Sequence, residues 1–172
     1  MFRGKRIKLC AIEREHLPNY VQWLNDPVVL EHFGSHLPIS QAQEEEWYEK
    51  QLQDSSVCNF AIEFRGQHVG GAGFCGIDGR NRSAEVGLFI GLPELWDQGL
   101  GRDVLQTLLH FGFEQLNLNR IYLRVFAENA RAVHLYEKIG FQHEGRLREA
   151  EFRHGHYQDL LWMSILRDEW SG

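Results

Sequence analysis

The hexapeptide Gln98-Gly99-Leu100-Gly101-Arg102-Asp103 separates a strand-like segment, residues 83–92, from a segment with the pattern of an α-helix. Glycines let a ligand approach the backbone, and the first N–H groups of a helix attract anions. The hexapeptide therefore indicates either a phosphate-binding loop or a glycine-rich helix start without a ligand. The helix is predicted because apolar residues follow at helical spacing, at Val104, Leu105, Leu108, Leu109, Gly112 and Leu116.

Two common phosphate-binding motifs do not fit this hexapeptide. No Gly-Lys-Ser/Thr follows it, which excludes a Walker loop. The third glycine of the dinucleotide motif Gly-x-Gly-x-x-Gly is missing, and the strands that precede the loop form a meander. A ligand bound here would therefore carry a pyrophosphate without being a nucleoside triphosphate or NAD.

A second informative segment spans residues 129–141 and predicts a short helix that Gly140 ends. Asn129, Ala132, Val133 and Tyr136 share one face of that helix, and an adjoining apolar flank carries Leu135 and Ile139. An amide and a phenol thus lie two turns apart beside a small residue that lets a ligand come near. Taken alone, the same residues also fit an asparagine N-cap and a tyrosine half-buried in the core.

The rest of the chain predicts strands and helices around these two segments. A parallel strand pair is expected, because a helix crosses between residues 83–92 and 121–126. The predicted fold is α/β (α+β), a mixed and mostly antiparallel sheet with one central parallel pair and flanking helices, in a single domain of residues 1–172. Further strands are expected at 7–11, 57–64, 67–77, 141–152 and 157–166, and helices at 13–24, 40–53 and after Asp26-Pro27, where Gly34 would end the helix.

Composition narrows the class of protein. The 172 residues carry a net charge of −6, which argues against nucleic acid as a partner and tolerates a cationic one. No apolar stretch is long enough to span a membrane, and no apolar signal core follows the basic N-terminus, so a cytoplasmic location is expected. Neither the nine histidines nor the three cysteines have metal-site spacing, so no metal is expected.

Together the two segments resemble the GCN5-related N-acetyltransferase (GNAT) superfamily, and the resemblance covers nearly the whole chain. The family's phosphate loop, Gln/Arg-x-x-Gly-x-Gly/Ala, is matched by Gln98, Gly101 and, imperfectly, Asp103. The downstream pattern is matched in full by Asn129, Ala132, Tyr136, Gly140 and Phe141. The branch of ribosomal-protein N-terminal and spermidine N-acetyltransferases is the most similar. This resemblance implies acetyl transfer from acetyl-CoA to a primary amine; the alternative is a silent acyl-CoA sensor.

The resemblance also implies where acetyl-CoA binds. Strands 86–90 and 121–125 would splay, and the pantetheine arm would pair with the backbone of Leu88, Phe89 and Ile90. The cofactor pyrophosphate would meet the loop N–H groups of Gly99, Leu100, Gly101, Arg102 and Asp103. The Asp103 carboxylate would repel the pyrophosphate unless its side chain points away, toward the solvent face of its helix. Asn129 would hydrogen-bond the arm beside Ala132, and Tyr136 would protonate the leaving thiolate.

The acceptor amine is the least determined feature. Glu85 is the candidate general base, and a solvated strand carboxylate is the alternative. Glu44-Glu45-Glu46 is interpreted as the solvent-exposed face of a helix. A polyamine, a protein N-terminus and an antibiotic amine all remain open, and a homodimer is a further expectation. By resemblance, the acceptor pocket would include Trp23, Asp26, Glu31 and Phe33, with Glu149, Glu151 and Tyr157 opposite.

Overall fold

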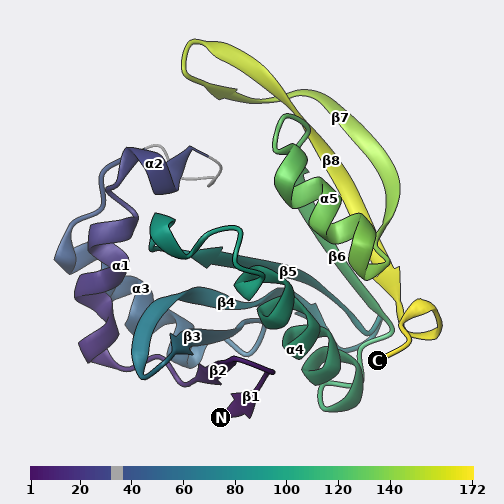
Figure 1. Cartoon of the computed structure of the whole chain (residues 1–172), viewed down its shortest axis with the longest axis horizontal. Helices are drawn as coiled ribbons and strands as arrows, with labels where there is room; N and C mark the ends of the chain where they lie inside the picture. Colours follow the sequence, from purple (N-terminus) through teal and green to yellow (C-terminus); the bar gives the residue numbers. More distant parts are fainter. Residues whose placement is uncertain (32–36) are drawn as a thin grey trace.

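Figure 1 shows the computed structural model, which describes residues 1–31 and 37–172. Within these residues an eight-stranded sheet runs through the molecule, with helices on both of its faces. The strands are β1 (Phe2–Arg3), β2 (Ile7–Cys10), β3 (Cys58–Phe64), β4 (Gln67–Asp78), β5 (Ser83–Ile90), β6 (Arg120–Phe126), β7 (Gln142–Arg153) and β8 (His156–Leu166). The α-helices are α1 (Leu17–Trp23), α2 (Pro27–Leu30), α3 (Gln41–Gln53), α4 (Leu100–Glu114) and α5 (Ala130–Ile139).

The order of the strands confirms the predicted mixed sheet. It runs β1-β2-β3-β4-β5-β6-β8-β7, and in the described chain only β5 and β6 pair in parallel. Side chains along β3 point alternately to the two faces of the sheet, and each face carries its own core. Phe60 and Ile62 belong to the larger core, which includes the apolar face of α4, whereas Ala61 packs with residues of α1 and α3 on the opposite face.

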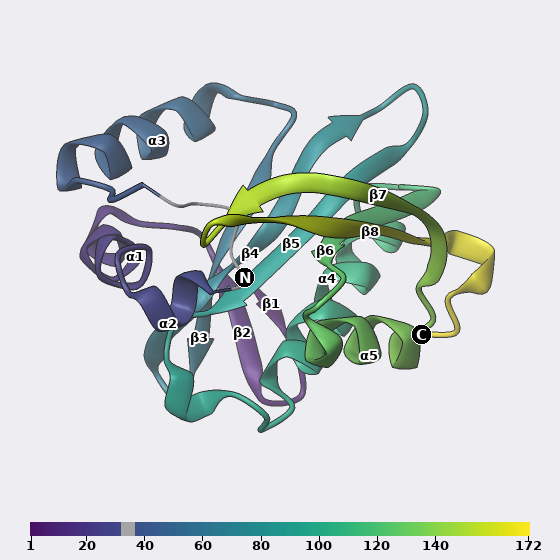
Figure 2. The same ribbon diagram turned by 90° about the horizontal axis from the view of Figure 1, so that it is seen from above.

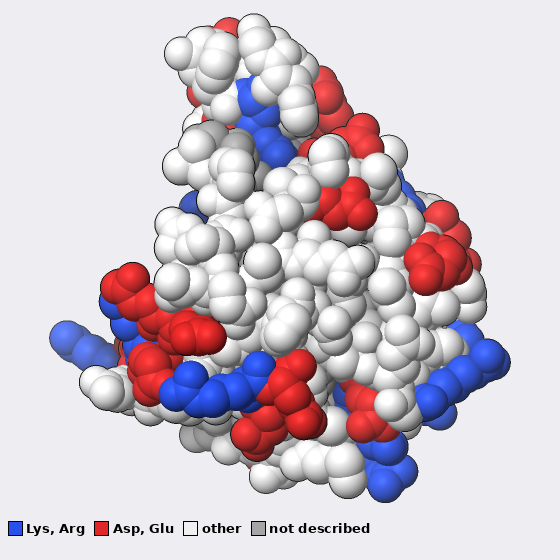
Figure 3. Space-filling model, turned by 90° about the vertical axis from the view of Figure 1, so that its left-hand side faces the viewer, with Lys and Arg blue, Asp and Glu red and all other residues white. Residues whose placement is uncertain are grey.

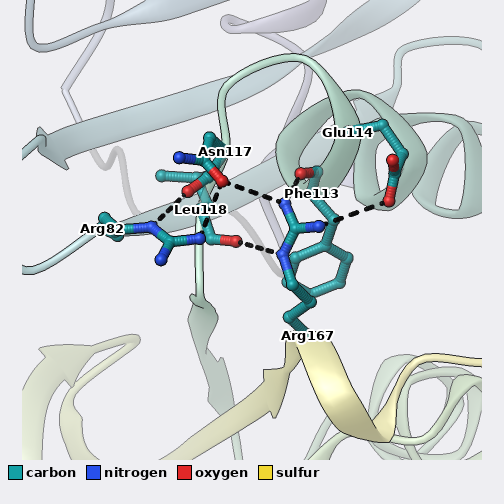
Figure 4. A network of polar contacts seen from close by, with 6 residues as sticks. All are labelled: Arg82, Phe113, Glu114, Asn117, Leu118 and Arg167. Atoms are coloured by element: carbon teal, nitrogen blue, oxygen red, sulfur yellow. Dashed lines mark hydrogen bonds and ion pairs between the residues drawn. The ribbon is translucent and has the colours of Figure 1, made fainter.

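A polar network holds the start of the parallel pair together (Figure 4). The Arg82 guanidinium donates to the carbonyl and the side-chain oxygen of Asn117, at 2.7 and 2.8 Å. Arg167, which follows β8, donates to the carbonyls of Phe113 and Leu118. The turn from α4 into β6 is therefore tied both to β5 and to the C-terminal segment.

Most predicted elements are present within one or two residues of the expected bounds. Two local differences have simple causes. The first helix begins as a 3₁₀ turn, Arg14–His16, and α1 carries Pro18 in its first turn, where no N–H is needed. The short strand β1 escaped prediction because two residues show no periodicity. The expected helix end at Gly34 lies outside the described residues.

Charged side chains of both signs are interspersed on the side of the molecule that carries α1 and α2. Figure 3 shows acidic and basic groups gathered along the lower edge of this face, with a largely uncharged surface above them. No helix of the described chain is long and apolar enough to cross a membrane.

The acidic run on α3 is only partly a solvated face. Glu45 and Glu46 are exposed, as predicted, but Glu44 is 4% exposed and faces the smaller core. Its carboxylate makes no hydrogen bond within the described residues, and burial raises its pKa. Nearby Tyr20 has a buried hydroxyl that also lacks a partner in the described chain, and burial raises its pKa further than the Glu44 charge does.

We expect Glu44→Gln to stabilise the protein at neutral pH by roughly 1–2 kcal/mol, because an unpaired buried carboxylate is costly. The folded-state pKa lies above the unfolded one, so the cost is present above the raised pKa and disappears as pH falls toward 4.5. Denaturant unfolding at several pH values measures this. Glu45→Gln, on the exposed face, is the matched control and should change little; equal stability of the Glu44 variant and wild type at pH 7 would contradict the expectation.

Candidate active site

The parallel strands separate soon after they begin, as the family resemblance implies. Ladder pairs join β5 to β6 only from Ser83↔Arg120 to Glu85↔Tyr122. Beyond that point β5 pairs with β4, and β6 pairs with β8. Residues 86–90 of β5 and 124–126 of β6 therefore border an opening of about 640 Å³.

Most of the predicted site residues line this one pocket. They come from β5, the start of α4 and the start of α5, which are separate in sequence. Two predicted loop residues, Gln98 and Asp103, do not line it. Those that do are Glu85, Leu88, Phe89, Ile90, Gly99, Leu100, Gly101, Arg102, Asn129, Ala132 and Tyr136.

The start of α4 presents free backbone donors to the pocket. Gly99 precedes the helix with φ +79°, a left-handed conformation that favours glycine. The first helical hydrogen bond runs from the Asp103 N–H to the Gly99 carbonyl at 3.2 Å. The N–H groups of Leu100, Gly101 and Arg102 therefore have no helical partner, and such groups at a helix start are suited to an anion.

Asp103 points away from the pocket, but not toward solvent as predicted. Its carboxylate is buried and accepts the backbone N–H groups of Lys5, Arg6 and Ile7 at 2.8, 2.7 and 3.1 Å. Three donors satisfy its charge, and a pyrophosphate at the helix start would not face it directly. The side chain thus points away from the pocket, as the sequence analysis required, but toward the N-terminal segment and not solvent, because its partners lie almost a hundred residues away in sequence.

Gln98 supports the same loop from outside the pocket. Its side-chain amide donates to the Glu94 carbonyl at 2.8 Å, and its own carbonyl accepts the Arg6 guanidinium at 2.6 Å. The ligand contact predicted for Gln98 stays a prediction, since its polar groups make these contacts within the chain. Together with Asp103, this residue ties the N-terminal segment to the start of α4.

Two cations of α5 join the pocket and were not predicted. Arg131 and Lys138 line it, together with the predicted Arg102. The Arg131 guanidinium lies 4.6 Å from the centre of the Trp96 ring and 3.6 Å from the Asp97 carboxylate. Arg131 and Lys138 are seven residues apart, so they lie on one side of the helix. This spacing, together with the predicted anion loop, is the sequence signal that could have identified them.

Asn129 was interpreted either as an N-cap or as a ligand-facing amide, and at the start of α5 the structure is compatible with both. Its side-chain oxygen accepts the Ala132 N–H at 3.1 Å, so it is an N-cap as well as a pocket residue. Ala132, Val133 and Tyr136 all pack against the larger core, so they share one face as predicted, and Leu135 on the adjoining flank lines the pocket.

Tyr136 faces the pocket with its ring 5.8 Å from that of Phe141. Its hydroxyl makes no hydrogen bond within the described chain, and burial raises its pKa to about 12. The phenol therefore stays protonated at neutral pH, and it can donate to an acceptor in the pocket.

Glu85 lines the pocket, but its carboxylate already has a partner. Arg124 on β6 donates to both Glu85 oxygens, at 2.8 and 3.1 Å, and this bond raises the pKa of Arg124. Glu151 lines the same region and makes no hydrogen bond or close ion pair with the described residues. Arg124 nevertheless lies near enough to interact with its charge.

Of the residues expected in the acceptor pocket, only Glu151 lines it within the described chain. Trp23 is buried in the smaller core, and Asp26 caps α2 by accepting the Val28 N–H. Tyr157 is exposed. Phe33 lies outside the described residues, and Glu31 and Glu149 do not line the pocket. The walls here are instead apolar, from Val29, Val86, Val125, Phe126 and Leu160.

Comparison with known proteins agrees with this geometry. The family model of the acetyltransferase (GNAT) domain matches residues 6–142. A spermidine N(1)-acetyltransferase of Vibrio cholerae serotype O1 is 35% identical over 169 residues, which cover 97% of this chain and 96% of the relative. A putative ribosomal N-acetyltransferase of Bacillus subtilis strain 168 is 29% identical over 125 residues, covering 73% and 68%.

Solved structures show the same similarity. The crystal structure of spermidine N-acetyltransferase from Vibrio cholerae with CoA and spermine has a TM-score of 0.91 to this chain at 34% identity, covering 96% of this chain and 98% of that one. Another structure of the Vibrio enzyme is dodecameric. The alternative of a silent acyl-CoA sensor finds no support among these relatives. The chain belongs to the GNAT family of acetyltransferases, and it transfers the acetyl group of acetyl-CoA to a primary amine.

Proposed function

We propose that the acceptor is a polyamine such as spermidine, and that residues 1–172 act as one acetyltransferase domain. The observation that carries this proposal is Glu151, a pocket carboxylate without a close partner in the described chain, at the end away from α4. A polyamine has a reacting amine and at least one more cation. The second cation would pair with Glu151, and the methylenes would lie against Val29 and Phe126. The activities of the Vibrio cholerae relatives support this choice.

For the cofactor, the residues present fit acetyl-CoA. The N–H groups of Leu100, Gly101 and Arg102 would hold the pyrophosphate, and Arg131 and Lys138 would add positive charge. The β5 edge at Leu88, Phe89 and Ile90, which lines the pocket, would pair with the pantetheine arm as an added strand would. The Asn129 amide N–H group, which the N-cap bond leaves free, would donate to the same arm.

Bound acetyl-CoA supplies the acetyl group in activated form, as a thioester. The acceptor must lose a proton, which for an alkylamine at neutral pH costs about 4 kcal/mol. Arg124 occupies one site on each Glu85 oxygen, so the remaining lone pairs could take that proton directly or through water. The Tyr136 hydroxyl would donate a hydrogen bond to the leaving sulfur as the thioester bond breaks. Glu85 is thus the proposed base, and Tyr136 is the proposed catalytic donor to the leaving thiolate.

The proposal is tested by thiol release from acetyl-CoA with three acceptors. Spermidine, butylamine and a short peptide with a free α-amine separate a polycation from a monoamine and from a protein N-terminus. We expect kcat/KM to be largest for spermidine. A preference for the peptide, or equal values for spermidine and butylamine, would refute the polyamine assignment while leaving acetyl transfer intact.

Glu151→Gln is expected to raise KM for spermidine by roughly ten- to a hundredfold, because one charge-assisted contact is worth roughly 1.5–3 kcal/mol. Neither KM for butylamine nor the acetyl-CoA Kd should change, since neither molecule meets this carboxylate. Glu149→Gln on the same strand, exposed and away from the pocket, is the control. If KM for spermidine is the same in both variants and in wild type, Glu151 does not select the acceptor.

Self-association and a cytoplasmic location belong to the proposal as well. The dodecameric form of the Vibrio cholerae enzyme supports self-association of this chain, beyond the homodimer expected from its sequence. Light scattering of the purified protein gives its mass in solution, and a monomer at micromolar concentration would contradict this part.

A further inference from the structure

The tip of the β7–β8 hairpin extends beyond the sheet. The pairing of β8 with β6 reaches only Phe126↔Leu160, and the β7–β8 ladder is irregular between Leu147 and Glu151. Residues 151–159 therefore form a two-stranded ribbon, and Figures 1 and 2 show it curving toward α2. A ribbon of this kind is marginally stable in water without further packing. It needs an anchor.

Arg153 supplies that anchor. It is 5% exposed, whereas its neighbour Phe152 is 59% exposed. Its guanidinium donates to the Leu30 carbonyl at 2.6 Å and to the Glu31 carbonyl at 3.2 Å, at the end of α2. The same group lies 5.0 Å from the centre of the Phe126 ring, at the end of β6. One side chain thus joins three elements.

The chemistry of this contact requires arginine. Within the described chain no carboxylate pairs with Arg153, and a buried cation without one is costly for stability. Two neighbouring carbonyls and an aromatic face offset that cost, because the planar guanidinium can donate along two directions while it stacks. A lysine ammonium is a point charge and cannot reproduce both contacts at once.

The three elements that Arg153 joins are the walls of one end of the pocket. Val29 precedes Leu30, Glu151 lies two residues before Arg153, and Phe126 lies beneath the guanidinium; all three line the pocket. We propose that Arg153 is a positioning residue that clamps the hairpin to α2 and so sets the width of the acceptor end. This inference rests on the acceptor end assigned above, and the cofactor end at α4 is untouched by it.

The experiment compares Arg153→Met and Arg153→Lys with Arg148→Met, an exposed arginine on the same strand. Arg153→Met should raise KM for the best amine about tenfold, as expected for lost hydrogen bonds to a charged group, while the acetyl-CoA Kd stays within about twofold. Arg153→Lys should be intermediate. In the free protein, amide exchange should become faster in α2 and in residues 151–159 for Arg153→Met, and should stay unchanged for Arg148→Met.

Amide exchange separates this inference from the proposed function. If wild type acetylates no polyamine, the acceptor assignment fails, yet faster exchange confined to α2 and the hairpin would still support the clamp. Unchanged exchange in the Arg153→Met variant overturns the clamp, whatever the acceptor is. A loss of acetyl-CoA affinity equal to the rise in amine KM also overturns it, because the effect would then be general.

Discussion

Gly101→Val is expected to weaken CoA binding about a hundredfold, equal to about 2.7 kcal/mol, in a protein that stays folded. A Cβ atom at Gly101 would lie 3.6 Å from a methyl of Leu135 and 3.8 Å from a methyl of Leu88. The side chain would therefore grow into the gap between β5 and α5, beside the free N–H groups of the helix start. Valine and glycine differ in helix propensity by less than about 1 kcal/mol, so stability should change little.

Gly101→Ala is the matched control. Its single methyl meets those neighbours at ordinary contact distances, so CoA affinity should fall by only a few fold, as a small steric loss implies. Calorimetric titration with CoA measures both variants. Thermal unfolding gives a second readout, because CoA at a hundred times its Kd should stabilise wild type by about 2.7 kcal/mol. A folded valine variant that binds CoA as wild type does would remove the start of α4 from the phosphate site.

Tyr136→Phe is expected to lower kcat by roughly ten- to a hundredfold with little change in CoA affinity, since one hydrogen bond to a charged group contributes about 1.5–3 kcal/mol. Burial raises the pKa of Tyr136 to about 12. Full transfer of its proton to a thiolate of pKa ~8.5 would be uphill by roughly 5 kcal/mol. The hydroxyl should therefore act mainly as a hydrogen-bond donor to the developing thiolate. That contact forms only as the bond breaks.

The measurement is turnover at saturating acetyl-CoA with the best amine, together with the CoA Kd and the thermal stability. Because the phenol stays protonated to about pH 12, its titration should produce no basic limb in kcat at ordinary assay pH. Unchanged kcat would leave Tyr136 as a packing partner of Phe141. Parallel losses in affinity and stability would assign the hydroxyl a structural role instead.

Features that depend on neighbours in sequence were predictable. The capping box of Ser40 and Gln43 and the left-handed Gly140 are confirmed, because a cap involves residues within one turn of each other. The parallel pairing of β5 and β6 followed from the helix that must cross between them. The pocket residues of α4 and α5 were identified because each set lies in a short motif with its own spacing, and those of β5 followed from the family resemblance.

Features that depend on distant partners were not predictable. Asp103 could have faced solvent or the interior, and the choice was made by backbone donors of the N-terminal segment. Glu85 was identified as a pocket carboxylate, but its ion pair with Arg124 depends on the register between two strands. The local periodicity of the sequence does not indicate the orientation of either side chain.

By itself, then, the amino-acid sequence determined the strands, the helices and their caps, the parallel pair and the family, since these follow from periodicity and short motifs. The tertiary structure alone decided which charged side chains are buried and what they contact. Glu44 faces a core, and Arg153 joins a hairpin to a helix more than a hundred residues away in sequence. A long polar side chain adopts the orientation in which its donors or acceptors find partners, and the fold as a whole supplies those partners.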